Sequence, residues 1–125
     1  GNTYYMGLME TNTKKPEQKD WAASVNVIFP NQKDRGTHTN ISGAAVTKSA
    51  KNKANAIKFI EFLTSNKAQK IYAEDNFEYP VKAGVALHPV VSDWGTFKAD
   101  DLHLSNVAKQ RTLATKIMDR VRYDN

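Results

Sequence analysis

The sequence contains no cysteine, so it can form neither disulfides nor thiolate metal sites. It also has no apolar run near the roughly 18 residues that a membrane-spanning helix needs. Its 125 residues are the size of one ordinary domain, and the 40% hydrophobic and 25% charged content is typical of soluble globular proteins. The absence of thiols is compatible with an oxidising compartment such as the periplasm but does not identify one.

Long runs of one charge are absent as well. The 18 basic residues exceed the 13 acidic ones, which gives a net charge of +5. They are scattered, however, and aromatic residues are not interleaved with them as stacking platforms for bases. We therefore interpret the basic residues as a solvated surface and expect no nucleic-acid partner. The pI near 9.4 is the only support for that alternative, which steeply salt-dependent retention on heparin would favour.

Apolar residues recur at helical spacing in two parts of the chain. The first runs from residue 52 to 76, and its pattern is interrupted at Thr64-Ser65-Asn66, where Ser65 or Asn66 can cap a second helix. The second follows Ser105, which we expect as an N-cap, and reaches about Arg122. A short helix is also expected over residues 6–10.

Two segments favour extended structure. Residues 25–29, Val-Asn-Val-Ile-Phe, predict a strand that is buried on most of both faces. Residues 37–46 are rich in β-branched side chains, and Gly43 within them indicates a bulge or a close backbone approach. Residues 11–19 and 82–98 are expected to be irregular, and Pro80 favours an extended conformation over residues 77–81.

The stretch with the clearest chemistry is Asn2-Thr3-Tyr4-Tyr5. If a helix begins near Thr3, both phenols lie in its first turn, close to unpaired backbone N–H groups that favour anions. A trivalent cation within bonding distance reverses the usual preference of a phenol for its neutral form, and two phenolate oxygens suit ferric iron. The alternative is that one ring packs in a core and the other lies at the surface. His38 could also bind iron, but we favour a hydrogen-bonded structural role for it.

A family resemblance supports the metal hypothesis. The Asn2-Thr3-Tyr4-Tyr5 stretch resembles the tyrosine-pair motif of the periplasmic ferric-iron-binding proteins of bacterial ABC importers. These are two-lobed type II binding proteins of the transferrin-like kind. The similarity continues, in the family's order, through residues 35–43, 55–63, 76–81 and 118–121. Each segment is a weak signal alone, and together they are specific.

The resemblance implies a fold and a site. The fold would be α/β, the C-terminal part of a two-lobed type II periplasmic binding protein, helix-rich with a few strands. Residues 1–125 would contribute to both lobes without an independent domain boundary. Tyr4 and Tyr5 match the paired metal ligands, and Asn2 matches a residue that holds the synergistic anion, phosphate or carbonate, on Fe³⁺. His38 matches no family ligand.

The resemblance also implies partners. The protein would be a periplasmic carrier, not an enzyme, that delivers ferric iron to an ABC permease in the inner membrane. The remaining ligands would come from an N-terminal part of the same protein, and self-association of this chain is a further expectation. The alternative is a type II binding protein for an amine, a sugar or an oxyanion, with Tyr4 and Tyr5 as aromatic walls.

Overall fold

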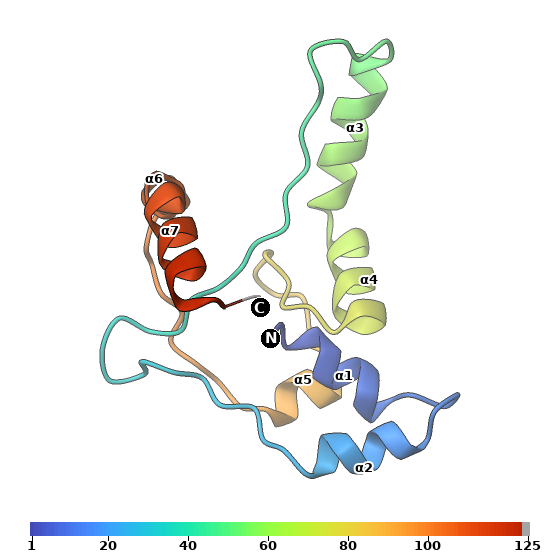
Figure 1. The fold of residues 1–125 in the computed structure, drawn as a ribbon. Helices are drawn as coiled ribbons and strands as arrows, with labels where there is room; N and C mark the ends of the chain where they lie inside the picture. The colour runs from blue at the N-terminus through green and yellow to red at the C-terminus, as the bar shows by residue number, and fades with distance from the viewer. Residues whose placement is uncertain (124–125) are drawn as a thin grey trace. The chain divides into compact units, whose positions relative to one another are not determined.

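The computed structural model describes residues 1–123, which form two compact units (Figure 1). The first unit comprises residues 1–28 and 41–96, and the second comprises residues 29–40 with the described residues from 97 onward. Within the described residues the regular structure is helical, and the only β pairing is an isolated parallel bridge between Thr37 and Ala99.

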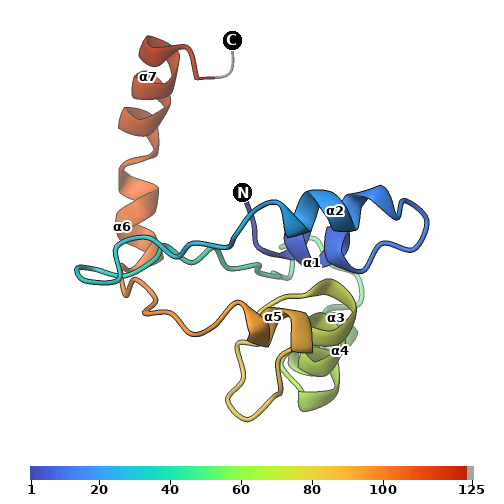
Figure 2. The ribbon, with the colours of Figure 1, turned by 90° about the horizontal axis from the view of Figure 1, so that it is seen from below.

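The first unit is built around α1 (Tyr4–Glu10), which contacts three other helices. It lies beside α2 (Glu17–Ala23), as Figure 2 shows, and also contacts α4 (Asn66–Asn76) and α5 (Pro89–Asp93). The core of this unit is small and consists of three alanines and two larger residues: Ala22, Ala68, Ala73, Phe77 and Val91. Small side chains let these short helices approach closely.

The helix pair α3 (Lys53–Leu63) and α4 confirms the predicted interruption and cap. Ser65 has an extended backbone conformation, and its hydroxyl accepts a hydrogen bond from the Ala68 N–H at 3.2 Å. This bond satisfies one of the unpaired donors at the start of α4. Residues 77–81, which were expected to be extended, lie outside any helix, but Phe77 has left-handed backbone angles (φ 55°, ψ 30°) and is not extended.

The second unit is held together by contacts between residues 29–40 and the segment from 97 onward. The rings of Phe29 and Phe97 stack with their centroids 4.4 Å apart. Thr37 donates its N–H to the Lys98 carbonyl and accepts one from Asp100, each at 2.8 Å. Gly36 has φ +99°, and a Cβ there would lie 2.7 Å from the Ala99 carbonyl oxygen, so this buried turn requires glycine.

The predicted strand over residues 25–29 is wrong. Trp21 to Ala23 belong to α2, and residues 25–29 then run without a ladder partner. Ile28 is 82% exposed, so this segment is not buried on both faces. β-branched residues favour a strand only where a neighbouring strand supplies hydrogen bonds and packing.

Three smaller expectations also fail. The C-terminal run is two helices, α6 (Leu104–Lys109) and α7 (Arg111–Val121), and the residue that caps α6 is His103 instead of Ser105. Gly43 is exposed, and a Cβ there would meet nothing within 4 Å, so it marks no close approach.

Residues 82–98 are not wholly irregular, since α5 lies within them. Pro89 is the first residue of α5, a position where its missing N–H costs nothing.

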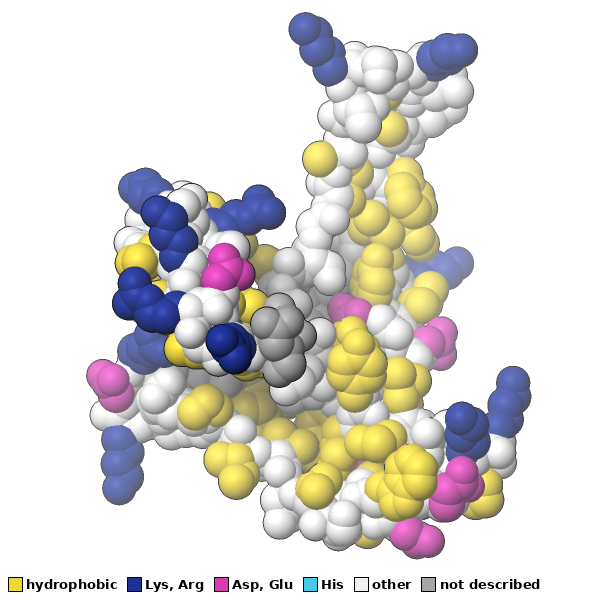
Figure 3. Space-filling model, viewed as in Figure 1, with side chains coloured by type: hydrophobic (Ala, Val, Ile, Leu, Met, Phe, Trp, Pro, Cys, Tyr) yellow, Lys and Arg dark blue, Asp and Glu magenta, His cyan; other side chains and the backbone are white. Residues whose placement is uncertain are grey.

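Many large apolar side chains lie at the surface, and Figure 3 shows hydrophobic side chains along α3. Phe59 of α3 is 60% exposed. On α7 the exposed apolar residues follow helical spacing: Leu113, Ile117, Met118 and Val121. No helix of the described chain is long and apolar enough to cross a membrane.

Candidate functional site

The first turn of α1 carries the tyrosine pair. Thr3 precedes the helix, and its side chain makes no capping bond. Two backbone N–H groups of this turn are already occupied: Tyr5 donates to the Asn2 carbonyl at 3.3 Å, and Met6 donates to the Thr3 carbonyl at 2.9 Å. These two groups are therefore not available to an anion, so the expectation of unpaired donors fails for Tyr5 and Met6.

The two phenol rings lie against each other. Their centroids are 4.4 Å apart, and the ring planes are tilted by 43°. Tyr5 is 55% exposed and Tyr4 is half-buried, so neither ring is enclosed in the core. The Asn2 amide donates a hydrogen bond to the Tyr4 hydroxyl oxygen at 3.3 Å. All three residues singled out by the sequence therefore form one contiguous polar group.

Hydrogen bonding makes the two phenols chemically unequal. The hydrogen bond from the Tyr5 hydroxyl lowers the pKa of Tyr4 from 10.0, and the Asn2 amide lowers it further. The same bond raises the pKa of Tyr5, because the Tyr5 proton is held in the bond to the Tyr4 oxygen. A Tyr4 phenolate also raises it, because it would repel a second negative charge on Tyr5. When the pair loses a proton, the negative charge therefore lies on Tyr4 before Tyr5.

A carboxylate lies near this charge. The negative charge of Glu78 raises the pKa of Tyr4, against the two hydrogen bonds that lower it. Glu78 directly follows Phe77, which packs on α1, and it accepts a hydrogen bond from the Asn76 amide. Phenol and carboxylate oxygens are the kind of ligand that a hard cation prefers.

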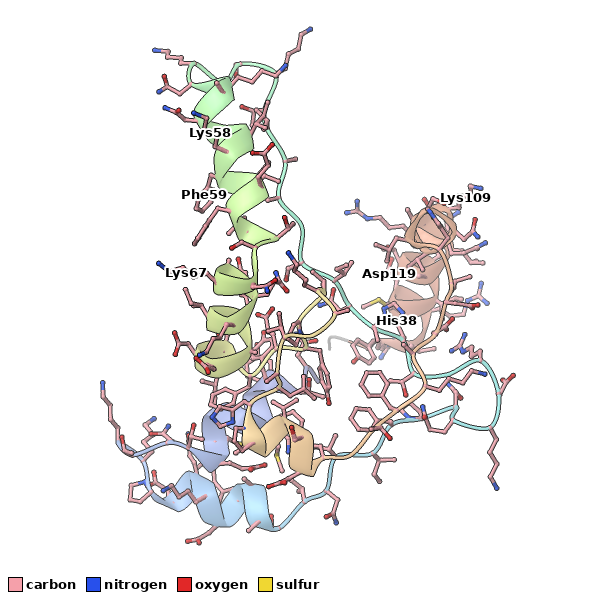
Figure 4. All side chains as sticks on the ribbon, turned by 180° about the vertical axis from the view of Figure 1, so that it is seen from behind. His38, Lys58, Phe59, Lys67, Lys109 and Asp119 are labelled. Atoms are coloured by element: carbon pink, nitrogen blue, oxygen red, sulfur yellow. The ribbon has the colours of Figure 1, made fainter. Side chains whose placement is uncertain are left out.

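The described residues hold no group of three or more His, Asp or Glu side chains that could bind a metal. His38, labelled in Figure 4, belongs to the second unit and is exposed. A cavity of about 620 Å³ lies between α1, α2 and α5, with Met6 and Trp94 in its lining, but neither tyrosine faces it. The tyrosine pair is therefore the candidate metal site of this chain.

Sequence reasoning missed the two residues whose contact supports the helix that carries Tyr4 and Tyr5. Gly7 of α1 is buried against the ring of Phe77, which caps the end of α4. The two residues are far apart in the sequence, and neither has a chemical function of its own. A glycine inside a short helical pattern is the only local signal, and it indicates a packing reason without naming the partner.

Comparison with known proteins matches this chain to one family. Residues 2–99 match the family model of bacterial extracellular solute-binding proteins. The chain is 49% identical over 118 residues to iron uptake protein A1 of Synechocystis, which covers 94% of this chain and 32% of that protein. It spans about a third of the length of the curated relatives that it matches along most of its sequence.

Solved structures agree with the sequence matches. The apo ferric ion-binding protein A of Pasteurella haemolytica superposes with a TM-score of 0.90 at 46% identity, over 100% of this chain and 38% of that one. A Trichodesmium protein in complex with iron and citrate ligands superposes with a TM-score of 0.89 at 48% identity, over 97% of this chain and 38% of that one. At this identity the likeness is one of family as well as of fold.

Proposed function

This chain belongs to the family of bacterial extracellular solute-binding proteins and has the fold of the corresponding part of type II periplasmic binding proteins, and we propose that it supplies paired tyrosine ligands to a ferric-iron site. The relatives named above for iron uptake and ferric ion binding support iron as the cargo. The structural observation that carries the proposal is the contact between the phenol rings of Tyr4 and Tyr5, with the Asn2 amide bonded to the Tyr4 oxygen.

The chemistry follows from the charge of the ion. Ferric iron prefers hard oxygen ligands, and its charge becomes the largest in the site, so it drives both phenols to ionise. The unequal pair eases the first step, since Tyr4 already ionises more readily than a free phenol. Binding releases protons, and the affinity for iron therefore falls as the pH falls.

Asn2 is proposed to help hold a synergistic anion, phosphate or carbonate, on the metal. One N–H of its side-chain amide is directed at the Tyr4 oxygen. A primary amide has a second N–H, which remains for an anion oxygen. Asn2 would then contact both a metal ligand and the anion, which places the anion beside Tyr4.

The whole protein is proposed to work as a periplasmic carrier. Iron enters an open cleft between two lobes, and hinge closure brings ligands from both lobes around it. The closed form docks on an ABC permease of the inner membrane, and reopening, loss of the anion or reduction releases the metal. No bond in a substrate is made or broken, so the proposed role is binding and not catalysis.

Two phenolates fill only part of the coordination shell of ferric iron. We propose that the remaining ligands come from an N-terminal part of the same protein, and that residues 1–125 contribute to both of its lobes. The exposed apolar side chains of α3 and α7 favour further packing of this kind, because burying each large side chain is worth about 1.5–3 kcal/mol. Self-association of the chain through the same side chains is the competing outcome, and sedimentation analysis distinguishes the two.

The central experiment adds ferric salt to the intact native protein. Phenolate-to-iron charge transfer should give a visible absorption band, and Tyr4→Phe combined with Tyr5→Phe should abolish it. Tyr123→Phe, which removes an exposed phenol of the second unit, is the matched control and should leave the band unchanged. A band that persists in the Tyr4→Phe, Tyr5→Phe protein would refute the ligand assignment.

The tilted contact between the two rings also suits a second function, the binding of an amine, a sugar or an oxyanion between aromatic walls. Such a protein would stay colourless with ferric salt. Its thermal transition would rise instead with one of these ligands, and the rise would depend on the rings of Tyr4 and Tyr5 but not on their hydroxyls.

A further inference from the structure

The helix that carries the tyrosine pair rests directly on one aromatic ring. Gly7 of α1 is buried, and a Cβ built on it would lie 2.4 Å from Cγ of Phe77 and 2.7 Å from its Cβ and Cδ1. Ordinary contacts of a Cβ begin at 3.4 Å. No side chain other than hydrogen fits at position 7 unless α1 moves away from Phe77 by about 1 Å.

Phe77 holds an uncommon conformation at this contact. It ends α4 with φ 55° and ψ 30°, the left-handed region that a bulky residue rarely adopts, and its N–H bonds to the Tyr72 carbonyl. The side chain is 6% exposed and meets the ring of His88 edge-on, with centroids 4.7 Å apart. Packing on both sides therefore keeps the ring in one position despite the backbone strain.

The contact lies one helical turn from the phenols. Gly7 follows Tyr4 by three residues, so the two positions share one face of α1. A rigid displacement of α1 at Gly7 is therefore transmitted to Tyr4 and, through the ring contact, to Tyr5. The same segment that supplies Phe77 also supplies Glu78, whose charge acts on Tyr4.

We propose that Gly7 and Phe77 are positioning residues for the tyrosine pair. Their close contact fixes the distance between α1 and the Phe77 ring, and thereby the positions of the two phenolate oxygens. The proposal rests on the proposed ferric-iron function. Metal-binding groups must be held to within about 0.5 Å of the productive geometry, so a shift of about 1 Å should weaken ferric binding by about tenfold or more.

The test uses Gly7→Ala in the intact native protein. We expect a weaker affinity for ferric iron and a shift in the wavelength of the charge-transfer band, which reports the iron–phenolate geometry. Gly43→Ala is the matched control, since a Cβ there meets nothing within 4 Å, and it should leave both quantities unchanged. Ser65→Ala, which removes a helix cap at the start of α4, controls for a loss of stability alone.

A relief variant separates positioning from general packing. All three atoms that a Cβ at position 7 would strike belong to the side chain of Phe77, so Gly7→Ala combined with Phe77→Gly removes the clash, and glycine tolerates the positive φ. Because the double variant also removes the ring on which α1 rests, it should relieve the clash without restoring the band of the unsubstituted protein, and full restoration would show that Gly7→Ala acted through the clash alone. A Gly7→Ala protein with unchanged band and affinity would overturn the proposal.

A second readout needs no iron and guards against failure of the double variant to fold. In the iron-free protein, the ring resonances of Tyr4 and Tyr5 should move in Gly7→Ala while that of Tyr123 stays in place. If these resonances move but the unsubstituted protein takes up no iron, the ferric function fails and the positioning contact stands. If iron binds normally and the resonances stay in place, the positioning contact fails and the ferric function stands.

Discussion

Gln69 gives the sharpest prediction of stability. Its side chain lies in α4, is 6% exposed and uses both ends of its amide. The nitrogen donates to the Leu63 carbonyl at the end of α3 at 2.8 Å, and the oxygen accepts the Val81 N–H at 2.9 Å. One side chain therefore ties the end of α3 to the far end of the 77–81 segment, whose first residue supports α1.

The substitution Gln69→Met removes both hydrogen bonds and little else. Methionine has a similar length and adapts to irregular space, so the packing term is small. Each bond contributes about 0.5–1.5 kcal/mol net, which gives a loss of about 1–3 kcal/mol in the free energy of unfolding. The upper part of this range is expected, because a carbonyl and an N–H are left without their partners in a partly buried place.

Denaturant unfolding of the intact native protein measures the effect, with the midpoint compared at constant slope. Gln110→Met is the matched control: it is the same substitution at an exposed position between α6 and α7, and it should change stability by less than about 0.5 kcal/mol. If the Gln69→Met and Gln110→Met proteins were equally stable, the two hydrogen bonds of the Gln69 side chain would not stabilise the fold as we expect.

Three further predictions concern the cap, the core and the phenols. Ser65→Ala should cost about 1 kcal/mol in unfolding free energy, and Ser65→Asn, which restores a capping oxygen, should recover most of it. Val91→Ala, at a side chain with 0% exposure, should cost about 2 kcal/mol in the same assay, because two methyl groups are lost and a cavity is left; the exposed Val121→Ala should cost far less. In the iron-free protein, ultraviolet or ring-NMR titration should find Tyr4 ionising below pH 10.0 and Tyr5 above it, and Asn2→Ala should raise the pKa of Tyr4; two independent transitions at the ordinary pKa would contradict the hydrogen-bonded pair.

Local signals predicted the helix pair well. The interruption after Leu63 and the cap at Ser65 depend on residues within one turn of each other, and they appear as expected. The first helix was expected to begin at residue 6, whereas α1 begins two residues earlier, at Tyr4.

Signals that depend on distant partners failed. The alternation in residues 25–29 is that of a strand, yet within the described chain no second strand pairs with it. The C-terminal run was expected as one helix, but the helix breaks at Gln110 into α6 and α7. Periodicity records which face is apolar; it does not record whether a partner is present to hold the element straight.

The candidate site also depends on both local and distant contacts. Asn2, Tyr4 and Tyr5 are adjacent in the sequence, so their chemistry and even their mutual hydrogen bonds follow from one short motif. What fixes the motif in space is the contact between Gly7 and Phe77, which joins two helices that are distant in the chain. A pair of phenols on an unsupported turn would have to be ordered by the metal itself, at a cost in affinity for every rotamer and backbone angle that is fixed. The close packing of α1 supplies that order before the ion arrives, and this is why a single methyl group at position 7 is expected to weaken iron binding although it lies one helical turn from the phenols.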